Sequence, residues 1–290
     1  MLAQTSTRLR RRCAVFVVVA AACVAIACAT THNYLDPAGP MYEGDLAPDA
    51  RDRTCGAQDG ALEVVTFNIE FAREIERAIA LLQTSAALRD VDILLLQEMD
   101  EPGVQRIALA LGLNYVYIPS TVHPQAGHDF GTAVLSPWPL DEPHKLLLPH
   151  AAYITRARRA AASAVVHCGT LRIRAMAVHL PAPAGVRDED REDQVRVMLA
   201  DLAGTPGPVI VGGDFNSRKM GSMFTKAGYR WLTDKLPGTS RGMGLWWSSD
   251  HVFARGFVPA GGGPSAGVVD SAGASDHRAV WVRVAFQNEK

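Results

Sequence analysis

The sequence lacks the features that mark several large classes of protein. Its 290 residues carry a formal net charge of −1, whereas a tight nucleic-acid binder is usually basic. The five cysteines include no Cys-x-x-Cys pair of the kind that binds zinc or carries out redox chemistry. A Walker loop and a dinucleotide-binding fingerprint are also absent. The chemistry of this chain must therefore come from another set of residues.

Long hydrophobic runs are also missing, with one exception near the N-terminus. Residues 13–27 are apolar without interruption and follow arginines at positions 8, 10, 11 and 12. The run is shorter than the ~20 residues that a spanning helix needs, so an export signal over residues 1–27 is the better interpretation. Without its four arginines the chain has 25 basic against 30 acidic residues, a net charge of −5.

The run ends in Ala25-Ile26-Ala27-Cys28, which resembles the cleavage box of a bacterial lipoprotein. In that case Cys28 would carry lipid and attach the protein to a membrane. Ordinary cleavage near Ala27 or Ala29, and a retained anchor, are the alternatives. All three predict an exported protein, either at the outer face of a bacterial membrane or periplasmic or secreted.

The remaining chain divides into a lead-in and one domain. Residues 28–60 are rich in Pro, Gly, Asp and Thr and predict a tether, whereas residues 61–287 predict a single catalytic domain. Cys55 and Cys168 are the cysteines left after export and lipidation. In an oxidising compartment they suggest one disulfide, and two separate free thiols are the alternative.

Short polar segments follow apolar runs throughout the expected domain. The segments are Thr66-Phe67-Asn68-Ile69-Glu70, Leu96-Gln97-Glu98, Val178-His179-Leu180, Gly212-Gly213-Asp214-Phe215-Asn216, Ser249-Asp250-His251 and Ser275-Asp276-His277. Each apolar run is expected to be a buried strand, so one rim of a sheet could collect all the polar side chains. Amide and carboxylate oxygens suit a hard divalent cation, and imidazoles transfer protons. This combination is what hydrolysis of a phosphate ester by an activated water requires.

The spacing of apolar residues predicts an α+β domain. Helices are expected over 72–89, 102–112 and 187–203, and strands over 62–69, 91–97, 115–118, 132–135, 160–167, 171–179, 209–212, 252–254 and 279–286. The segment 217–247 is expected to be rich in loops. Strands outnumber helices and mix hairpin with crossover connections, which favours sheets inside and helices outside.

These segments, in this order, resemble the endonuclease/exonuclease/phosphatase family of deoxyribonuclease I-like phosphoesterases. The likeness covers roughly residues 61–287. It implies a four-layered sandwich of two mixed β-sheets flanked by helices, with the site at one rim. It also implies a Mg2+-dependent hydrolase of phosphoester bonds, with Mn2+ as a substitute. A phosphodiesterase or nuclease is the first expectation, and a sphingomyelinase-like lipid phosphodiesterase or an inositol-phosphate phosphatase is the alternative.

The resemblance also implies roles for individual residues. Glu98, with Glu70 and Asp276, would hold the metal; Asn68 and Arg159 would bind substrate. Catalysis would fall to the side chains that activate water and stabilise the phosphoryl group: His179, Asp214, Asn216, Asp250 and His277. A solvated surface charge is the alternative for Arg159.

The resemblance has one gap and leaves the substrate open. Deoxyribonucleases support the histidine that matches His179 with a glutamate, but residues 120–131 contain no Glu, and Asp129 is the only acidic candidate there. The expected partner is nucleic acid or a phospholipid head group, bound by a monomer. An apolar hairpin within 218–247 would favour lipid, whereas basic or aromatic side chains along a groove would favour nucleic acid.

Overall fold

The computed structural model describes residues 31–47, 60–124 and 126–287. The predicted signal peptide 1–27, Cys28 and Cys55 lie outside these residues. Cys168 is disulfide-bonded. Its pairing with Cys55 therefore stays a prediction.

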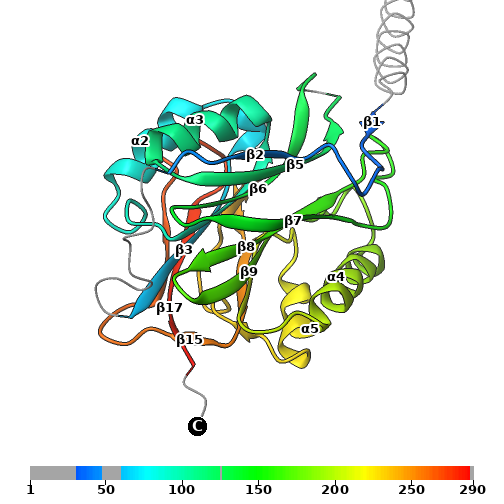
Figure 1. The fold of residues 1–290 in the computed structure, drawn as a ribbon. Helices are drawn as coiled ribbons and strands as arrows, with labels where there is room; N and C mark the ends of the chain where they lie inside the picture. Colours follow the sequence, from blue (N-terminus) through cyan, green and yellow to red (C-terminus); the bar gives the residue numbers. More distant parts are fainter. Residues whose placement is uncertain (1–30, 48–59, 125, 288–290) are drawn as a thin grey trace, which may run out of the picture.

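Two large β-sheets form the centre of the molecule (Figure 1). The nine-stranded sheet runs in the order β1-β5-β6-β4-β3-β17-β15, with β2 beside β5 and β16 beside β17. Its strands are β1 (His32–Asn33), β2 (Tyr42–Gly44), β3 (Ala61–Asn68), β4 (Ile93–Met99), β5 (Asn114–Val122), β6 (Asp129–Ser136), β15 (Phe257–Pro259), β16 (Ala266–Val269) and β17 (Ala279–Phe286).

The second sheet has six strands in the order β11-β14-β10-β9-β8-β7. They are β7 (Leu140–Leu147), β8 (Ala160–Cys168), β9 (Leu171–His179), β10 (Val209–Asp214), β11 (Arg230–Trp231) and β14 (Asp250–Arg255). A separate two-stranded hairpin consists of β12 (Ser240–Gly242) and β13 (Leu245–Trp247). Both large sheets are mixed, because β3 pairs with β4, and β9 with β10, in parallel, while the other pairings are antiparallel.

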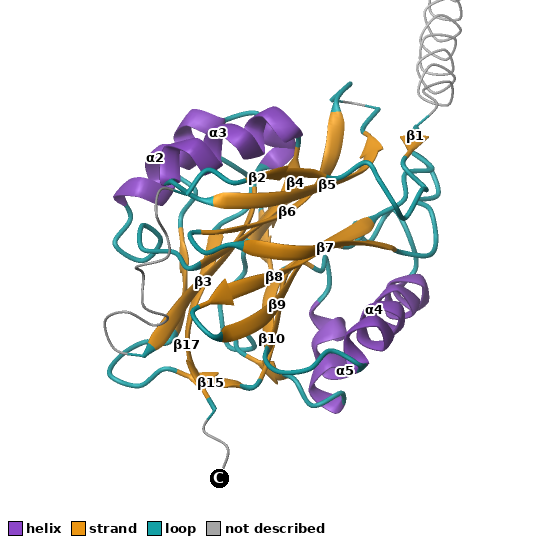
Figure 2. Ribbon diagram, in the orientation of Figure 1, coloured by secondary structure: helices purple, strands orange, loops and turns teal. Residues whose placement is uncertain are grey.

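Helices cover the outer faces of the two sheets (Figure 2). Helices α2 (Ile75–Thr84) and α3 (Glu101–Leu111) pack on the nine-stranded sheet, and α4 (Asp188–Ala203) and α5 (Gly221–Lys226) pack on the six-stranded sheet. The order helix, sheet, sheet, helix is the four-layered α+β sandwich that the sequence predicted, and the prediction is confirmed.

The layers are held by separate apolar clusters. The cluster between the sheets joins Leu95 and Val64 of one sheet to Ala175 and Ile210 of the other. All four side chains are fully buried. Strands that are buried on both faces consist of continuous apolar runs, and for this reason β3 and β4 could be predicted from the sequence.

Local sequence explains where the helices begin and end. Asp100 precedes α3 and accepts a hydrogen bond from the Gly103 backbone N–H at 2.9 Å, as an N-cap residue does. Gly112 ends α3 with φ of 64°, a left-handed conformation that glycine adopts without steric cost. The predicted helix 102–112 is therefore correct to within one residue at each end.

The structure adds elements that the sequence did not predict. Strand β7, the short helix α5 and the β12–β13 hairpin were missed, and the last two lie in the segment expected to be loop. Part of the predicted tether also packs on the domain, since β1 and β2 pair with β5. Among the residues that the structure describes, no helix is both long and apolar enough to cross a membrane.

Candidate active site

The predicted polar segments meet at one rim of the sandwich. Asn68 ends β3, His179 ends β9 and Asp214 ends β10, while Glu98 lies near the end of β4. Asp250 begins β14, and His277 lies two residues before β17. Three of these residues come from each half of the sandwich. The rim therefore forms a site between the two sheets, as the sequence predicted.

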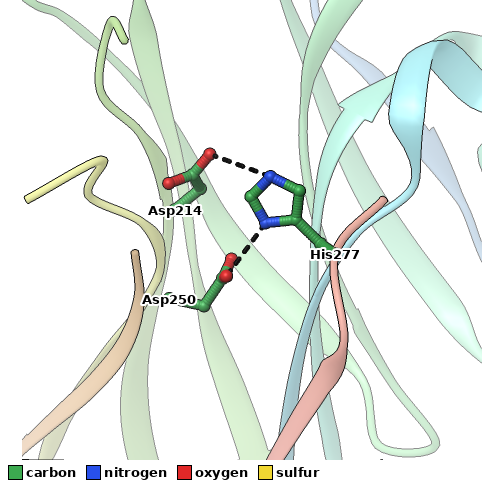
Figure 3. Close-up of side chains that lie close together, drawn as sticks. All are labelled: Asp214, Asp250 and His277. Carbon is green, nitrogen blue, oxygen red and sulfur yellow. Dashed lines mark hydrogen bonds and ion pairs between the residues drawn. The ribbon is translucent and has the colours of Figure 1, made fainter. Parts of the chain in front are cut away.

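Asp250 and His277 form the closest ion pair of the site (Figure 3). Nδ1 of His277 lies 2.9 Å from Oδ2 of Asp250, and both side chains are buried. Burial alone would lower the pKa of His277, but the carboxylates of Asp250 and Asp214 outweigh it and raise that pKa to about 10. His277 is therefore an imidazolium at neutral pH.

Asp214 is buried and held by amide groups. Its Oδ2 accepts hydrogen bonds from Asn68 Nδ2 at 3.2 Å and from Asn216 Nδ2 at 3.0 Å, and its Oδ1 accepts one from the Asn216 backbone N–H at 2.8 Å. Burial raises the pKa of Asp214 to about 7, although the His277 charge opposes this rise. A carboxylate with a pKa near neutrality is suited to accept a proton from water.

Glu98 presents its carboxylate to neutral donors. Oε1 accepts a hydrogen bond from Asn68 Nδ2 at 3.2 Å, and Oε2 accepts one from the Phe71 backbone N–H at 3.1 Å. Burial raises the pKa of Glu98, because the charged form is poorly solvated there. The residue itself has a positive φ of 59° at a break in the register between β4 and β6. Such strain at a non-glycine residue is typical of functional sites.

His179 and the Asp250–His277 pair lie on opposite sides of Asp214, because β9 and β14 flank β10. The surroundings of His179 differ from those of His277. Nε2 of His179 is 3.5 Å from Asp214 Oδ2, but its buried Nδ1 has no hydrogen-bond partner among the described residues. Burial lowers the pKa of His179 well below the usual value, and the Arg159 charge adds to this effect. The acidic candidate Asp129 instead accepts a hydrogen bond from the Tyr34 hydroxyl at 2.7 Å. His179 is thus a neutral imidazole without the carboxylate support that deoxyribonucleases provide.

Arg159 lies against this neutral side of the site. Its guanidinium stacks over the Phe130 ring at 4.6 Å, and the same ring lies 5.5 Å from the His179 ring. Nε and Nη1 of Arg159 are buried without a hydrogen-bond partner in the described part of the chain. Burial lowers the pKa of Arg159, while Glu98 and Asp214 favour its charged form. The alternative of a solvated surface charge is therefore wrong.

Two predicted metal ligands lie further out. Glu70 accepts a hydrogen bond from Arg73 Nη1 at 2.9 Å, and a third of its side chain is exposed. Asp276 is an exposed residue, although its charge raises the pKa of both Glu98 and His277. Their metal roles stay predictions, and Glu98 is the least exposed acidic member of the predicted ligand set, with 15% of its side chain accessible.

Two groups of side chains could hold a cation. One carboxylate or imidazole atom from each of Asp214, Asp250 and His277 lies within 4.8 Å of the others. An imidazolium cannot ligate a metal, however, because both nitrogens carry protons, so this trio is better suited to proton transfer. Glu98 offers a partly buried carboxylate whose hydrogen bonds come from neutral groups. Hard divalent cations prefer such carboxylate oxygens, so the Glu98 side of the site fits the expected metal.

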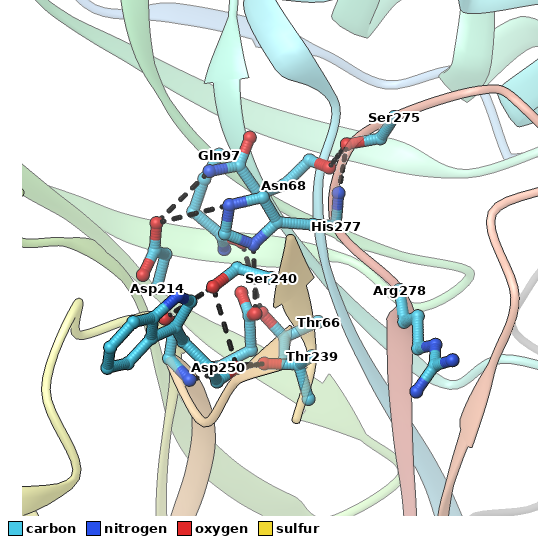
Figure 4. Close-up of polar contacts among 12 residues, drawn as sticks. Thr66, Asn68, Gln97, Asp214, Thr239, Ser240, Asp250, Ser275, His277 and Arg278 are labelled. Atoms are coloured by element: carbon cyan, nitrogen blue, oxygen red, sulfur yellow. Dashed lines mark hydrogen bonds and ion pairs between the residues drawn. The ribbon is translucent and has the colours of Figure 1, made fainter. Parts of the chain in front are cut away.

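Two positioning residues were missed by sequence reasoning (Figure 4). The Ser275 hydroxyl donates to the Asn68 carbonyl oxygen at 2.7 Å and accepts from the His277 backbone N–H at 3.0 Å, which joins β3 to the His277 loop. The Thr239 hydroxyl accepts from the Asp250 backbone N–H at 3.0 Å. Ser275 could have been found from its position two residues before a histidine, where serine forms a local turn. Thr239 carries no comparable signal.

Comparisons with known proteins bear on the family and the fold of the chain. The model of the "Endonuclease/Exonuclease/phosphatase family" matches residues 65–277. No curated protein matches the chain in sequence.

Solved structures with the same fold include members from distant organisms. An endonuclease/exonuclease/phosphatase from Beutenbergia cavernae is 20% identical with a TM-score of 0.62 and covers 79% of this chain and 72% of its own. A family protein from Bacteroides thetaiotaomicron is 15% identical with a TM-score of 0.63, and covers 80% and 100%. D. rerio TDP2, solved with a single-strand DNA product, is 16% identical with a TM-score of 0.61, and covers 78% and 99%. At these identities the likeness shows the fold.

Proposed function

Because the chain belongs to the endonuclease/exonuclease/phosphatase family, we propose that this phosphoester hydrolase is a divalent-metal-dependent phosphodiesterase. The observation that carries the proposal is the meeting of Glu98, Asp214 and the Asp250–His277 pair at one rim. These groups offer a cation site, a base and an imidazolium within one buried network, which is the set that attack of water on a phosphodiester needs.

Glu98 would hold the cation, for which we propose Mg2+ with Mn2+ as a substitute. Asn68 lies beside it, and its amide nitrogen bridges Glu98 and Asp214. When bound, the cation supplies positive charge that screens the phosphoryl oxygens from the incoming water. The raised pKa of Glu98 indicates that its negative charge is poorly compensated by the protein alone.

Asp214 is the proposed base for the attacking water. Its pKa of about 7 allows it to be ionised and yet able to accept a proton near neutral pH. The two hydrogen bonds from Asn216 fix the direction of the carboxylate. Asn216 itself is anchored, because its side chain also donates to the Leu180 carbonyl oxygen at 2.9 Å.

His277 is the proposed stabiliser of the negative charge that develops on the phosphoryl oxygens. Its pKa of about 10 keeps it protonated, and Asp250 fixes the orientation of the ring through Nδ1. The other nitrogen, Nε2, lies 3.8 Å from Asp214 Oδ2 and therefore faces the proposed base. Arg159 would add a second positive charge, since its unpartnered N–H groups can bind a phosphate oxygen.

The structure also bears on the substrate classes that the sequence left open. Basic side chains in residues 218–247 could contact nucleic acid. Lys219 contacts Asp188, Arg230 Nε donates to the Phe257 carbonyl oxygen and Arg218 stacks on Trp231, whereas Arg241 is exposed. Among the apolar residues of the same segment, Met220 and Phe224 belong to the core. Exposed apolar side chains remain on the β12–β13 hairpin. This apolar hairpin supports a substrate at a lipid surface, whereas its exposed Trp246, Trp247 and Arg241 are also compatible with a nucleic acid.

The proposal is tested with a panel of substrates. DNA, RNA, sphingomyelin, a phosphoinositide, bis(4-nitrophenyl) phosphate and 4-nitrophenyl phosphate are assayed with Mg2+, Mn2+ or EDTA. We expect the diesters to be hydrolysed faster than the monoester, and EDTA to abolish turnover. Asp214→Asn is the matched inactive control, because the amide keeps the size of the side chain but cannot act as a base. Faster hydrolysis of the monoester, or full activity of the control variant, would contradict the proposal.

A further inference from the structure

The β12–β13 hairpin carries an exposed apolar surface beside the active site. Its exposed members are Met243 (95% exposed), Leu245 (60%), Trp247 (51%) and Trp246 (41%). Four large apolar side chains are thus exposed within five consecutive positions. Exposed patches of this kind mark interaction surfaces. We call residues 240–247 the rim hairpin.

The tip of the rim hairpin keeps a methionine in a strained conformation. Gly242 pairs with Leu245, so Met243 and Gly244 form a two-residue loop with φ of 49° and 78°. This geometry strongly favours Asn or Gly at the first position, and methionine there costs free energy. Met243 is 95% exposed, so packing within the domain does not explain the residue. Contact with a partner outside the domain would explain why methionine occupies this position.

The base of the rim hairpin belongs to the active-site wall. Ser240 forms an isolated bridge with His277, and the Arg241 backbone N–H donates to the Asp276 carbonyl oxygen at 3.0 Å. Arg278 lies over the Trp246 ring at 3.7 Å and thus places a cation beside the apolar patch. Anything that binds the rim hairpin is therefore held next to the imidazolium of the site.

The N-terminal segment enters the domain at the same rim. His32 and Asn33 pair with Val122 and Thr121, at the end of β5 that lies beyond Glu98 and near the start of β6 (Figure 1). In the nine-stranded sheet β1 is five strands away from β17, which is about 24 Å at the usual strand spacing of ~4.8 Å. Strand β1 and the rim hairpin thus flank the active site from opposite sides.

The sequence before residue 31 indicates what lies outside this rim. Residues 13–27 are uninterruptedly apolar and are followed by Cys28. Only two residues separate Cys28 from Thr31, and the three residue-to-residue steps between them span only about 10 Å when fully extended. If either the apolar run or a lipid on Cys28 is inserted in a bilayer, the catalytic rim must lie close to that bilayer.

We propose that the partner of the rim hairpin is a lipid bilayer, so that the catalytic rim is the membrane-facing surface of this protein. Tryptophan suits the boundary between lipid and water, because its ring is apolar while its N–H can form hydrogen bonds. Arg241 is exposed on the same hairpin and can contact a lipid phosphate. Met243 and Leu245 at the tip would reach deepest into the acyl region. The inference rests on the hairpin and on the place of entry of the chain, and it does not depend on the chemistry of the site.

The test measures quenching of tryptophan fluorescence by lipid. The full chain, as exported and processed by its host, is mixed with vesicles of brominated phosphatidylcholine, whose bromine atoms quench nearby indole rings. We expect strong quenching that falls at least twofold in the Trp246→Phe, Trp247→Phe double variant. Trp281→Phe is the matched control, because Trp281 lines a separate groove with Glu63 and Asp90. Its removal is expected to leave the quenching of the remaining rings in place.

A second variant separates docking from catalysis. Met243→Ser with Leu245→Ser should lower the quenching severalfold, while turnover of bis(4-nitrophenyl) phosphate stays within twofold of wild type. Equal quenching in this variant and in wild type would overturn the proposal, and so would undiminished quenching in the double tryptophan variant. Quenching by single-stranded DNA in place of vesicles would assign the rim hairpin to nucleic acid. A protein that docks but hydrolyses no diester would refute the proposed function and leave this inference standing.

Discussion

The two histidines of the active site occupy one rim but differ in charge. His277 is paired with Asp250 at 2.9 Å, and its pKa is raised to about 10. His179 has a buried Nδ1 without a partner among the described residues, and burial lowers its pKa well below the usual value. Both imidazoles face Asp214. The difference teaches that a carboxylate on the far nitrogen, more than burial itself, decides which imidazole carries charge.

The largest loss of turnover is expected for a change of Asp214, the carboxylate that both histidines face. Asp214→Asn should lower kcat by about 10²–10⁴-fold, the scale of one general base. The amide can still accept a hydrogen bond from Asn68, so the fold should persist. Steady-state kinetics with bis(4-nitrophenyl) phosphate and an unfolding curve measure the two quantities. A loss below tenfold would remove Asp214 from the chemistry.

The variant His277→Ala removes the charged histidine of the pair. We expect turnover to fall by about 10²–10⁴-fold, because the imidazolium is lost from the site. Asp250→Asn should fall in the same direction, since the ring would lose its orienting carboxylate. The double variant should be little worse than His277→Ala alone, because groups that act as a unit are not additive. Independent, multiplicative losses would show that the two residues work separately.

Substitution of the neutral histidine, His179, should lower turnover less than substitution of His277. His179→Gln is expected to lower kcat by roughly 10–100-fold, as for loss of one hydrogen bond to a charged group worth about 1.5–3 kcal/mol. Glutamine keeps a neutral donor, so a larger loss than that of His277→Ala would reverse the comparison. The same kinetic assay, run side by side on both variants, decides the order.

The two histidines should also tilt the dependence of stability on pH in opposite directions. The raised pKa of His277 contributes stability below about pH 6.5, and this contribution is lost as pH rises toward about 10. The lowered pKa of His179 acts the other way, because the unfolded state takes up a proton as pH falls through about 6.5 while the folded state does not. In metal-free protein, His277→Gln should flatten the alkaline decline and His179→Gln the acidic one. Denaturant melts between pH 5 and 10 measure both, and identical profiles for the two variants would contradict the assignment.

The sequence predicted the surroundings of His277 better than those of His179. Asp250 and His277 lie at or just before the strands β14 and β17, and they have a simple physical relation, a carboxylate beside an imidazole, so their pairing could be inferred. The absence of Glu from residues 120–131 correctly warned that His179 lacks support. The engagement of Asp129 by Tyr34 could not be inferred, because Tyr34 belongs to a segment expected to be a tether.

Other features depended on backbone geometry that no side-chain pattern reveals. Glu70, Phe71 and Ala72 all have positive φ, and this left-handed turn lets Glu70 pair with Arg73 while the Phe71 N–H reaches Glu98. The rim hairpin was missed because strands of three residues are too short to show alternation. Strand β7 was missed because it contains Pro143 and is only partly buried.

The smallest expected effect concerns a residue that acts through Asp250. Thr239→Val removes the hydroxyl that accepts from the Asp250 and Ser249 backbone N–H groups. We expect a loss of about 1–3 kcal/mol in stability, as for a buried donor left unsatisfied, and only a severalfold fall in kcat. Thr225→Val on the exposed side of α5 is the matched control and should change neither quantity. If the fall in kcat for Thr239→Val equals that of Asp250→Asn, Thr239 has a direct part in the site.

The central claim is that this rim hydrolyses phosphodiesters with a divalent cation held by Glu98. The most direct test follows hydrolysis of bis(4-nitrophenyl) phosphate by metal-free protein as Mg2+ is returned, in wild type and in Glu98→Gln. The account predicts no turnover without metal, restoration by Mg2+ in wild type, and no restoration in Glu98→Gln over the same concentrations. Turnover by the metal-free protein, or the same Mg2+ dependence in both proteins, would contradict it.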